Sequence, residues 1–243
     1  MSDQNNSFEF DSALFKKRSL FSVRQGRALR GERAEAMEAL FPKLSISEEI
    51  LSENHQLATA DLFYKNFSEF WLEIGFGHGE RLAQLCRSNK NVGYIGVEPF
   101  MNGMAAFLKD IKEDELDNIR VLMDDGMIVA RSLKENSLDG IYILNPDPWH
   151  KKRHHKRRIL SQKNLDVFSK IIKPGGHLIM STDVEDLAEW MCLQASHHPD
   201  FTWTANNKAN WYNAPNDWIS TKYEKKGAKG AKKMIYLFFE KNK

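Results

Sequence analysis

The stretch Phe70-Trp71-Leu72-Glu73-Ile74-Gly75-Phe76-Gly77-His78-Gly79 decides the fold class of this 243-residue chain. Five mostly apolar residues precede three glycines at alternate positions, and Glu80 to Ser88 follow with leucines at helical spacing. An apolar run, a glycine turn and an amphipathic segment predict a buried strand, a tight turn and a helix. Glycines at such a turn let the backbone approach a ligand closely.

Strand-like and helical segments alternate along the rest of the chain. Strands are expected at 70–74, 94–97, 119–123, 141–144, 177–181, 201–205 and 235–239, and helices at 80–88, 103–111, 165–172 and 186–195. Lys173-Pro174-Gly175-Gly176 is expected to end the helix at 165–172 as a turn. This alternation predicts an α/β protein with a Rossmann-like, doubly wound and mainly parallel sheet. The last two strands have no evident helix between them, which predicts an antiparallel hairpin at one edge.

The composition excludes several other classes of protein. A hydrophobic content of 42% and a charged content of 28% are not those of a disordered, collagen-like or coiled-coil chain. No uncharged apolar run approaches the ~20 residues that span a bilayer, and the first residues lack a signal pattern. Cys86 and Cys192 form no CxxC motif, which fits a reducing compartment. We therefore expect a cytoplasmic protein without a membrane partner.

The formal net charge of +2 conceals three segments of different sign. Residues 1–33 carry seven basic and four acidic side chains, residues 34–149 carry ten and twenty, and residues 150–243 carry eighteen and nine. An acidic centre between basic flanks favours a polyanionic partner held by the flanks. We expect residues 1–33 to form a flexible basic arm and residues 34–243 to form the folded domain.

Acidic residues around the glycine turn indicate which ligand it binds. Glu98 ends the next strand, nineteen residues after Gly79, where nucleotide-binding sheets place an acid against ribose hydroxyls. The spacing is GxGxG rather than GxGxxG, and Glu73 before the glycines would repel a pyrophosphate. A carboxylate there suits an ammonium or sulfonium group, and S-adenosylmethionine carries both. Asp124-Asp125 follows the third strand, where an acid or amide can contact an adenine amino group.

The segment Asn145-Pro146-Asp147-Pro148-Trp149 follows the fourth strand, where ligands bind in open α/β sheets. Asp147 could accept hydrogen bonds from the Watson–Crick edge of guanine, and Trp149 offers a face for stacking on a base. The next residues, 151–158, contain six Lys or Arg, which indicates contact with a phosphate backbone. Thr182-Asp183 and Thr221-Lys222-Tyr223-Glu224 are expected at the same cleft.

These motifs together resemble the bacterial tRNA (guanine-N7)-methyltransferase family of the TrmB type, from about Arg24 to Glu240. The resemblance implies a class I methyltransferase fold, S-adenosylmethionine as methyl donor, and guanosine 46 in the variable loop of tRNA as acceptor. It implies a catalytic role for Asp147 and cofactor contacts from Glu73, Gly75, Gly77, Gly79, Glu98, Asp125 and Asp147. It implies substrate contacts from Lys151, Asp183, Thr221, Lys222, Tyr223 and Glu224, and RNA contacts from Arg153, His154, His155, Lys156, Arg157 and Arg158.

Departures from the family pattern leave alternatives open. Asn145 stands where the family commonly has Phe, and the Asn-Pro-Asp-Pro-Trp segment loosely resembles the Asn-Pro-Pro-Tyr motif of amino-methyltransferases that act on adenine or cytosine. A non-catalytic RNA-binding protein with the same fold is a second alternative, and a nicotinamide dehydrogenase is the least favoured. No metal site is expected, because the histidines at 150, 154 and 155 lie among basic residues. The sequence does not distinguish a monomer from a homodimer.

Overall fold

The computed structural model describes residues 26–51, 57–112, 114, 116–205, 207–216, 218–221, 224 and 233–243. Its strands are β1 (Glu69–Ile74), β2 (Val92–Val97), β3 (Ile119–Leu122), β4 (Leu138–Leu144), β5 (Ile172–Thr182), β6 (Phe201–Trp203) and β7 (Ile235–Lys241). Its α-helices are α1 (Glu32–Leu44), α2 (Glu80–Ser88), α3 (Met101–Asp110), α4 (Gly126–Ser132), α5 (Gln162–Ile171) and α6 (Glu185–Ser196). Short 3₁₀ helices lie at Glu48–Ile50, Thr59–Leu62, Lys152–Arg157 and Lys208–Trp211.

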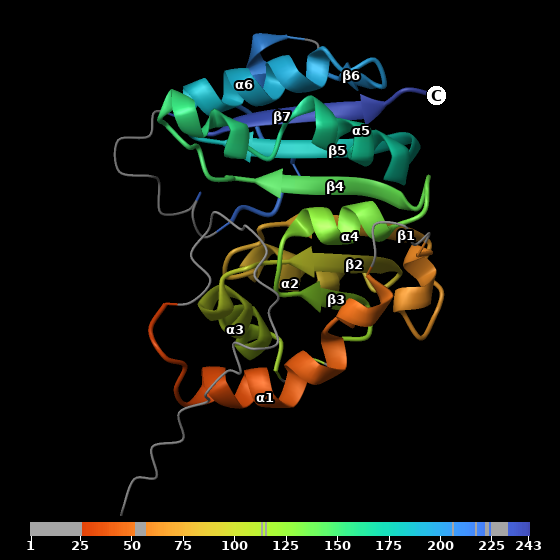
Figure 1. The fold of residues 1–243 in the computed structure, drawn as a ribbon, viewed down its shortest axis with the longest axis vertical. Helices are drawn as coiled ribbons and strands as arrows, with labels where there is room; N and C mark the ends of the chain where they lie inside the picture. Colours follow the sequence, from red (N-terminus) through yellow and green to blue (C-terminus); the bar gives the residue numbers. More distant parts are fainter. Residues whose placement is uncertain are drawn as a thin grey trace, which may run out of the picture.

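The strands form one sheet in the order β3-β2-β1-β4-β5-β7-β6 (Figure 1). The five strands β1 to β5 run parallel, and β7 runs antiparallel to both β5 and β6. This arrangement confirms the predicted mainly parallel sheet with an antiparallel pair at one edge. The strand order reverses between β1 and β4, so the loops after these two strands meet at the switch point where open α/β sheets bind ligands.

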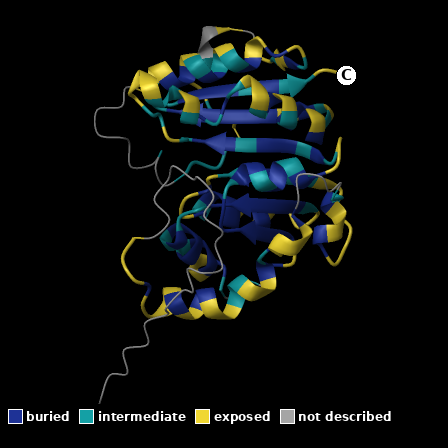
Figure 2. Cartoon of the chain, viewed as in Figure 1, coloured by how far each residue is buried: buried dark blue, intermediate teal, exposed yellow. Residues whose placement is uncertain are grey.

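Helices cover both faces of the sheet, and Figure 2 shows the strands buried between them. Helices α1, α2 and α3 share one core cluster, with Met37, Leu82 and Phe107 among its buried members. Helices α4, α5 and α6 contribute Val129, Phe168 and other residues to the second cluster. Strands buried on both faces read as continuous apolar runs, which is why the sequence predicted them.

Three elements differ from the sequence expectations. Helices α1 and α4 were not expected, and Lys173-Pro174-Gly175-Gly176 belongs to β5 rather than to a turn after a helix. Strand β5 begins at Ile172, directly after α5, and its pairing with β4 shifts register between Leu138 and Gly140. Proline and glycine are tolerated in a strand at such an irregularity, because the ladder is interrupted there. No helix in the described ranges is long and apolar enough to cross a membrane.

The described end of the predicted arm, residues 26–33, packs against the domain. The side-chain carbonyl of Asn102 on α3 accepts a hydrogen bond from the Gly26 amide at 2.7 Å, and its amide group donates to the Arg27 carbonyl at 2.8 Å. Leu29 is buried in the same cluster as α1 and α3. Residues 1–25 lie outside the described residues, so the boundary between arm and domain stays a prediction.

Candidate active site

Two adjoining cavities open at the carboxyl ends of the parallel strands. The first, of about 520 Å³, is lined by residues including Glu73, Asp183 and Thr221. The second, of about 630 Å³, is lined by residues including Glu98, Asp125 and Trp149. Both volumes lie in the range of ordinary small-molecule sites. The two cavities share Gly75 and the loop residues Asn145, Pro146 and Asp147, so this loop forms a common wall.

The glycine turn after β1 approaches both cavities with bare backbone. Gly75, Gly77 and Gly79 have φ values of 76°, 63° and 74°, a region that side chains disfavour. A Cβ atom at Gly75 or Gly77 would meet no other atom within 4 Å, whereas one at Gly79 would lie 2.5 Å from the Phe107 ring. Gly79 therefore allows close packing of α2 on α3. Gly75 and Gly77 leave open space at the cavities.

Two of the predicted cofactor acids also hold the local backbone. The carboxylate of Glu98 accepts hydrogen bonds from the amides of Gly77 at 2.7 Å and Phe100 at 2.9 Å. Burial raises the pKa of Glu98, and these two amides oppose that effect. Asp125 is the N-cap of α4, where its carboxylate accepts from the Met127 amide at 3.0 Å. Each acid thus fixes the loop that presents it.

Glu73 lies at the floor of the first cavity in a buried ion pair. Its Oε2 atom is 3.1 Å from Nη1 of Arg81, and both residues are 4% exposed. Burial raises the pKa of Glu73, while the charge and hydrogen bond of Arg81 act in the opposite direction. The guanidinium of Arg81 also lies over the rings of Tyr142 at 4.0 Å and Trp218 at 4.8 Å.

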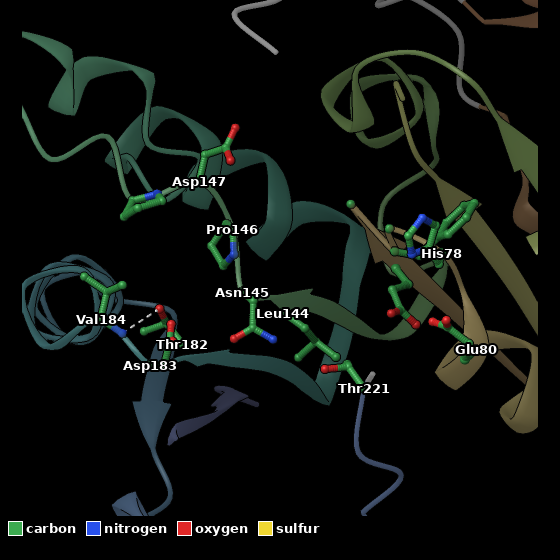
Figure 3. A pocket seen from close by; sticks show the side chains of 15 residues that line it. His78, Glu80, Leu144, Asn145, Pro146, Asp147, Thr182, Asp183, Val184 and Thr221 are labelled. Atoms are coloured by element: carbon green, nitrogen blue, oxygen red, sulfur yellow. Dashed lines mark hydrogen bonds between the residues drawn. The ribbon is translucent and has the colours of Figure 1, made fainter. Parts of the chain in front are cut away.

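The loop after β4 is held in an unusual backbone conformation. Asn145 and Trp149 have φ values of 49° and 46°, which side chains rarely adopt. The Asn145 amide donates to the Ser181 carbonyl at 2.7 Å, which ties the loop to β5. Asp147 is exposed, and Figure 3 shows its carboxylate pointing away from Asn145 and from the labelled residues of β5. Asp147 lines both cavities, and its carboxylate points away from the other labelled residues of the first one.

Arg158 is more deeply buried than the other predicted RNA-binding residues. Arg158 is 3% exposed, its Nε atom donates to the Pro148 carbonyl at 2.9 Å, and it forms an ion pair with Asp186 on α6. Its guanidinium carbon also lies 5.3 Å from the ring of Trp190. These contacts hold the loop that carries Asp147, and Arg158 also lines the second cavity. The RNA-binding role expected for Arg158 stays a prediction.

The remaining basic residues lie at the surface beside the second cavity. Lys151, Arg153 and Lys156 are exposed, and Lys156 and Arg157 line that cavity. The guanidinium of Arg157 lies 4.9 Å from the ring of Trp149. His154 and His155 are half-buried, and the ring of His155 packs edge-on against Trp190. No group of three or more His, Cys, Asp or Glu in the described part of the chain is placed to hold a metal ion.

The predicted substrate segment is described at two of its four residues. The Thr221 hydroxyl accepts from the Glu224 amide at 3.1 Å, and the Glu224 carboxylate accepts from the Thr221 amide at 3.3 Å, as in a capping box. Thr221 and Asp183 both line the first cavity. Lys222 and Tyr223 lie outside the described residues. The structure thus brings Thr221 and Asp183 together with Glu73.

Several residues at the site were not expected from the sequence. Arg81 pairs with Glu73 of the first cavity and lies over the ring of Trp218, and Arg131 and Lys163 line the second cavity. Arg81 follows the glycine turn directly, but its pairing with Glu73 depends on how that turn folds back. Trp218 is more than a hundred residues away in sequence, so no local pattern could associate it with Arg81.

Comparison with known proteins gives the family. A family model described as "Putative methyltransferase" matches residues 68–237. The tRNA (guanine-N(7)-)-methyltransferase of Agrobacterium fabrum is 38% identical over 91% of this chain and 94% of its own length. That of Rhodospirillum rubrum is 35% identical over 91% of this chain and 87% of its own length. The chain belongs to the tRNA (guanine-N7)-methyltransferase family.

Membership in the tRNA (guanine-N7)-methyltransferase family confirms the resemblance stated from the sequence motifs. The solved structure of the 16S rRNA methyltransferase KamB has a TM-score of 0.51 with this chain at 12% identity, and the match covers 73% of this chain and 90% of that one. At this identity the likeness concerns the fold alone, and it agrees with a class I methyltransferase architecture. Within this family member, the glycine turn, the Asp147 loop and Thr221 surround one site.

Proposed function

We propose that this chain transfers a methyl group from S-adenosylmethionine to N7 of guanosine 46 in the variable loop of tRNA. The observation that carries the proposal is the pair of cavities that share the Asp147 loop as a wall. One cavity offers Glu98 and Asp125, and the other offers Glu73, Asp183 and Thr221. S-adenosylmethionine would span both cavities, because the acids proposed to hold it lie in both, and a target base would meet it at Asp147.

The residues present fit S-adenosylmethionine. The space beside Gly75 and Gly77 is open, so a ligand can approach their backbone closely. Glu73 supplies a buried carboxylate for a cationic group. Glu98 retains lone pairs for ribose hydroxyls, and Asp125 is placed at the end of β3 for the adenine amino group. When bound, the cofactor supplies an activated methyl group on a sulfonium. Gly79 acts indirectly, because it allows α2 to pack closely behind the turn.

The chemistry requires orientation more than proton transfer. Guanine N7 has a lone pair and no proton, so no general base is needed to create the nucleophile. Holding the two reactants in line is worth up to ~7–11 kcal/mol of the barrier. The methylated purine is cationic, and the carboxylates of Asp147 and Asp183 would stabilise that charge as it develops. Arg158 contributes by holding the Pro148 carbonyl next to Asp147.

The basic surface beside the second cavity is proposed to hold the tRNA backbone. Lys151, Arg153 and Lys156 are exposed, and Arg131 and Lys163 add positive charge at the cavity itself. Contacts of this kind set the position of the RNA without reading its sequence. A tRNA acceptor, together with two free cysteines, favours the cytoplasm as the location of the enzyme.

The test is methyl transfer from labelled S-adenosylmethionine to a tRNA transcript, followed by mass spectrometry of the nucleosides. We expect 7-methylguanosine, and we expect it to disappear when guanosine 46 is replaced. Methylation of an exocyclic amine of adenine or cytosine would instead identify an amino-methyltransferase. Binding of tRNA without measurable cofactor binding in isothermal titration would identify a non-catalytic RNA-binding protein. Either outcome would overturn the proposal.

A further inference from the structure

Arg81 occupies the junction between the first cavity and the chain segment that follows β6. Its guanidinium lies between the ring of Tyr142 on β4 and the ring of Trp218, at 4.0 and 4.8 Å from the two ring centroids. Nη1 of the same group pairs with Glu73 on β1. A planar guanidinium suits both contacts at once, because it stacks on aromatic faces and donates in its own plane.

Trp218 is itself bonded to the predicted substrate segment. Its indole Nε1 donates to Oε2 of Glu224 at 3.1 Å, and the same oxygen accepts from the Thr221 amide at 3.3 Å. The rings of Tyr236 and Phe238 on β7 pack edge-on against the indole at 5.2 and 6.1 Å. We call Trp218, Thr221 and Glu224 the clamp, since hydrogen bonds join the three residues into one unit.

Two buried polar atoms around Arg81 lack a hydrogen-bond partner in the described part of the chain. Among the described residues, neither Nε of Arg81 nor Oε1 of Glu224 has a hydrogen-bond partner, although both atoms are buried. Glu73 accepts a hydrogen bond from Arg81, and Glu224 accepts one from the Trp218 indole on which the same guanidinium stacks. Nε of Arg81 and Oε1 of Glu224 can each take a further partner when the arrangement of Arg81 changes.

We propose that Arg81 is a positioning residue that couples the cofactor cavity to the clamp. The proposal rests on the proposed function, and it adds a link between the two sites of that reaction. A cationic cofactor beside Glu73 competes with Arg81 for the same carboxylate. Arg81 is then held more firmly by Trp218 and by the carboxylate of Glu224, which fixes Thr221 at the wall of the cavity. Cofactor and tRNA consequently bind more tightly together than separately.

A role in stability alone does not account for this arrangement. A buried ion pair contributes little net stability compared with apolar residues of similar size, because desolvating both charges is costly. The pair lies at the floor of a ligand cavity, and its cation contacts a residue that is bonded to the segment at the cavity wall. Since linkage between two ligands is reciprocal, it can be measured from either side without turnover.

The experiment measures the dissociation constant of sinefungin, a cofactor analogue with an ammonium group in place of the methylsulfonium, with and without saturating tRNA transcript, by isothermal titration. This ligand carries no transferable methyl group, so the readout is independent of activity. For the unmodified protein we expect tRNA to lower the constant by roughly fivefold or more, the range of typical couplings. For Arg81→Met we expect the ratio to fall to within about twofold of unity. Arg81→Lys keeps the charge but not the planar stack, and we expect an intermediate ratio.

Control variants separate coupling from general damage. Arg87→Met is the same substitution on the same helix, where Arg87 forms exposed ion pairs with Asp110 and Asp114, and it should leave the ratio unchanged. Combining Arg81→Met with Trp218→Leu should cost no more coupling than either change alone, because both interrupt one path. If Arg81→Met lowers the melting temperature so far that the variant is not folded during the titration, the ratio is measured on Arg81→Lys instead.

The outcomes distinguish this inference from the proposed function. A ratio of unity in the unmodified protein, or an undiminished ratio in both Arg81 variants, would overturn the coupling role. Guanine N7 methylation by the unmodified protein is measured separately on the same transcript. Absence of that methylation would overturn the proposed function, whereas methylation with unchanged coupling in the variants would overturn the role of Arg81 alone.

Discussion

Asp147 and Asp183 differ from the other carboxylates of the site in their exposure: Asp147 is exposed and Asp183 half-buried, whereas Glu73 and Glu98 are buried. Both aspartates line the first cavity, where a base that arrives from solvent would meet them. We expect Asp147→Ala and Asp183→Ala each to lower the methyl-transfer rate about a hundredfold, since removing one electrostatic contact to a transition state typically costs that much. The affinity for tRNA, measured by filter binding, should change little.

Asp110→Ala serves as the control for these two variants, because Asp110 pairs with Arg87 on the helix surface. Its rate and its tRNA affinity should both remain those of the unmodified protein. Normal turnover by Asp147→Ala or Asp183→Ala would remove that residue from the catalytic assignment.

Arg158 and Lys156 are neighbours in a basic run but have different surroundings. Arg158 is enclosed and bonded to Pro148 and Asp186, whereas Lys156 is exposed beside the second cavity. We expect Arg158→Leu to lower the free energy of unfolding in urea by about 1–3 kcal/mol, the cost of lost hydrogen bonds to a charged group. Lys156→Ala should leave stability unchanged and reduce the salt slope of tRNA binding by about one. The reverse pattern would support contact between Arg158 and the RNA.

At the scale of the element, α4 shows that one residue can serve two purposes. Asp125 caps the helix and also lines the second cavity. Asn and Ser cap helices about as well as Asp, while Ala costs about 1 kcal/mol. We expect Asp125→Ala to lose this stability in urea denaturation, and Asp125→Asn and Asp125→Ser to retain it. Only Asn keeps an oxygen that reaches the adenine amino group, so cofactor affinity should fall in the Ser variant and hold in the Asn variant. Equal affinity in all variants would leave Asp125 as a cap alone.

Elements were predictable where local pattern and burial coincide. The strands β2, β3 and β4 are buried along most of their length, so their apolar runs predicted them from the sequence. The sequence did not predict helix α4, because the helix has only seven residues and its N-cap, Asp125, was interpreted solely as a ligand-binding acid. The sequence did not predict the start of β5, because proline and glycine normally end helices and strands. In this strand they lie where the pairing with β4 shifts register. At the site, loop acids could be placed from topology, but the enclosure of Arg158 and the contact of Arg81 with Trp218 arise only from tertiary packing.

The whole molecule separates charge in a way that the total of +2 conceals. Residues 34–149 supply β1, β2, β3 and the buried carboxylates Glu73 and Glu98, and residues 150–243 supply most of the basic surface. The switch point of the sheet brings these two parts together at one cleft. At the second cavity, Glu98 and Asp125 from the acidic part meet Lys156 and Arg157 from the basic part, so charges that suit a cationic cofactor and a polyanion lie side by side.

The buried carboxyl group of Glu73 predicts that the stabilisation of the fold by S-adenosylmethionine depends on pH. Burial raises the pKa of Glu73 above its ordinary value of 4.5, so folding favours its protonated form. Stability from this shift is fully present below pH 4.5 and is lost as the pH rises through the raised pKa. A sulfonium favours the ionised carboxylate and offsets that loss.

The melting temperature with saturating S-adenosylmethionine should therefore exceed that with S-adenosylhomocysteine by a margin that grows with pH across this window. Thermal unfolding from pH 4.5 to 8 measures the margin, and Glu73→Gln should make it independent of pH. Margins that stay parallel in the unmodified protein would show that Glu73 does not face the sulfonium.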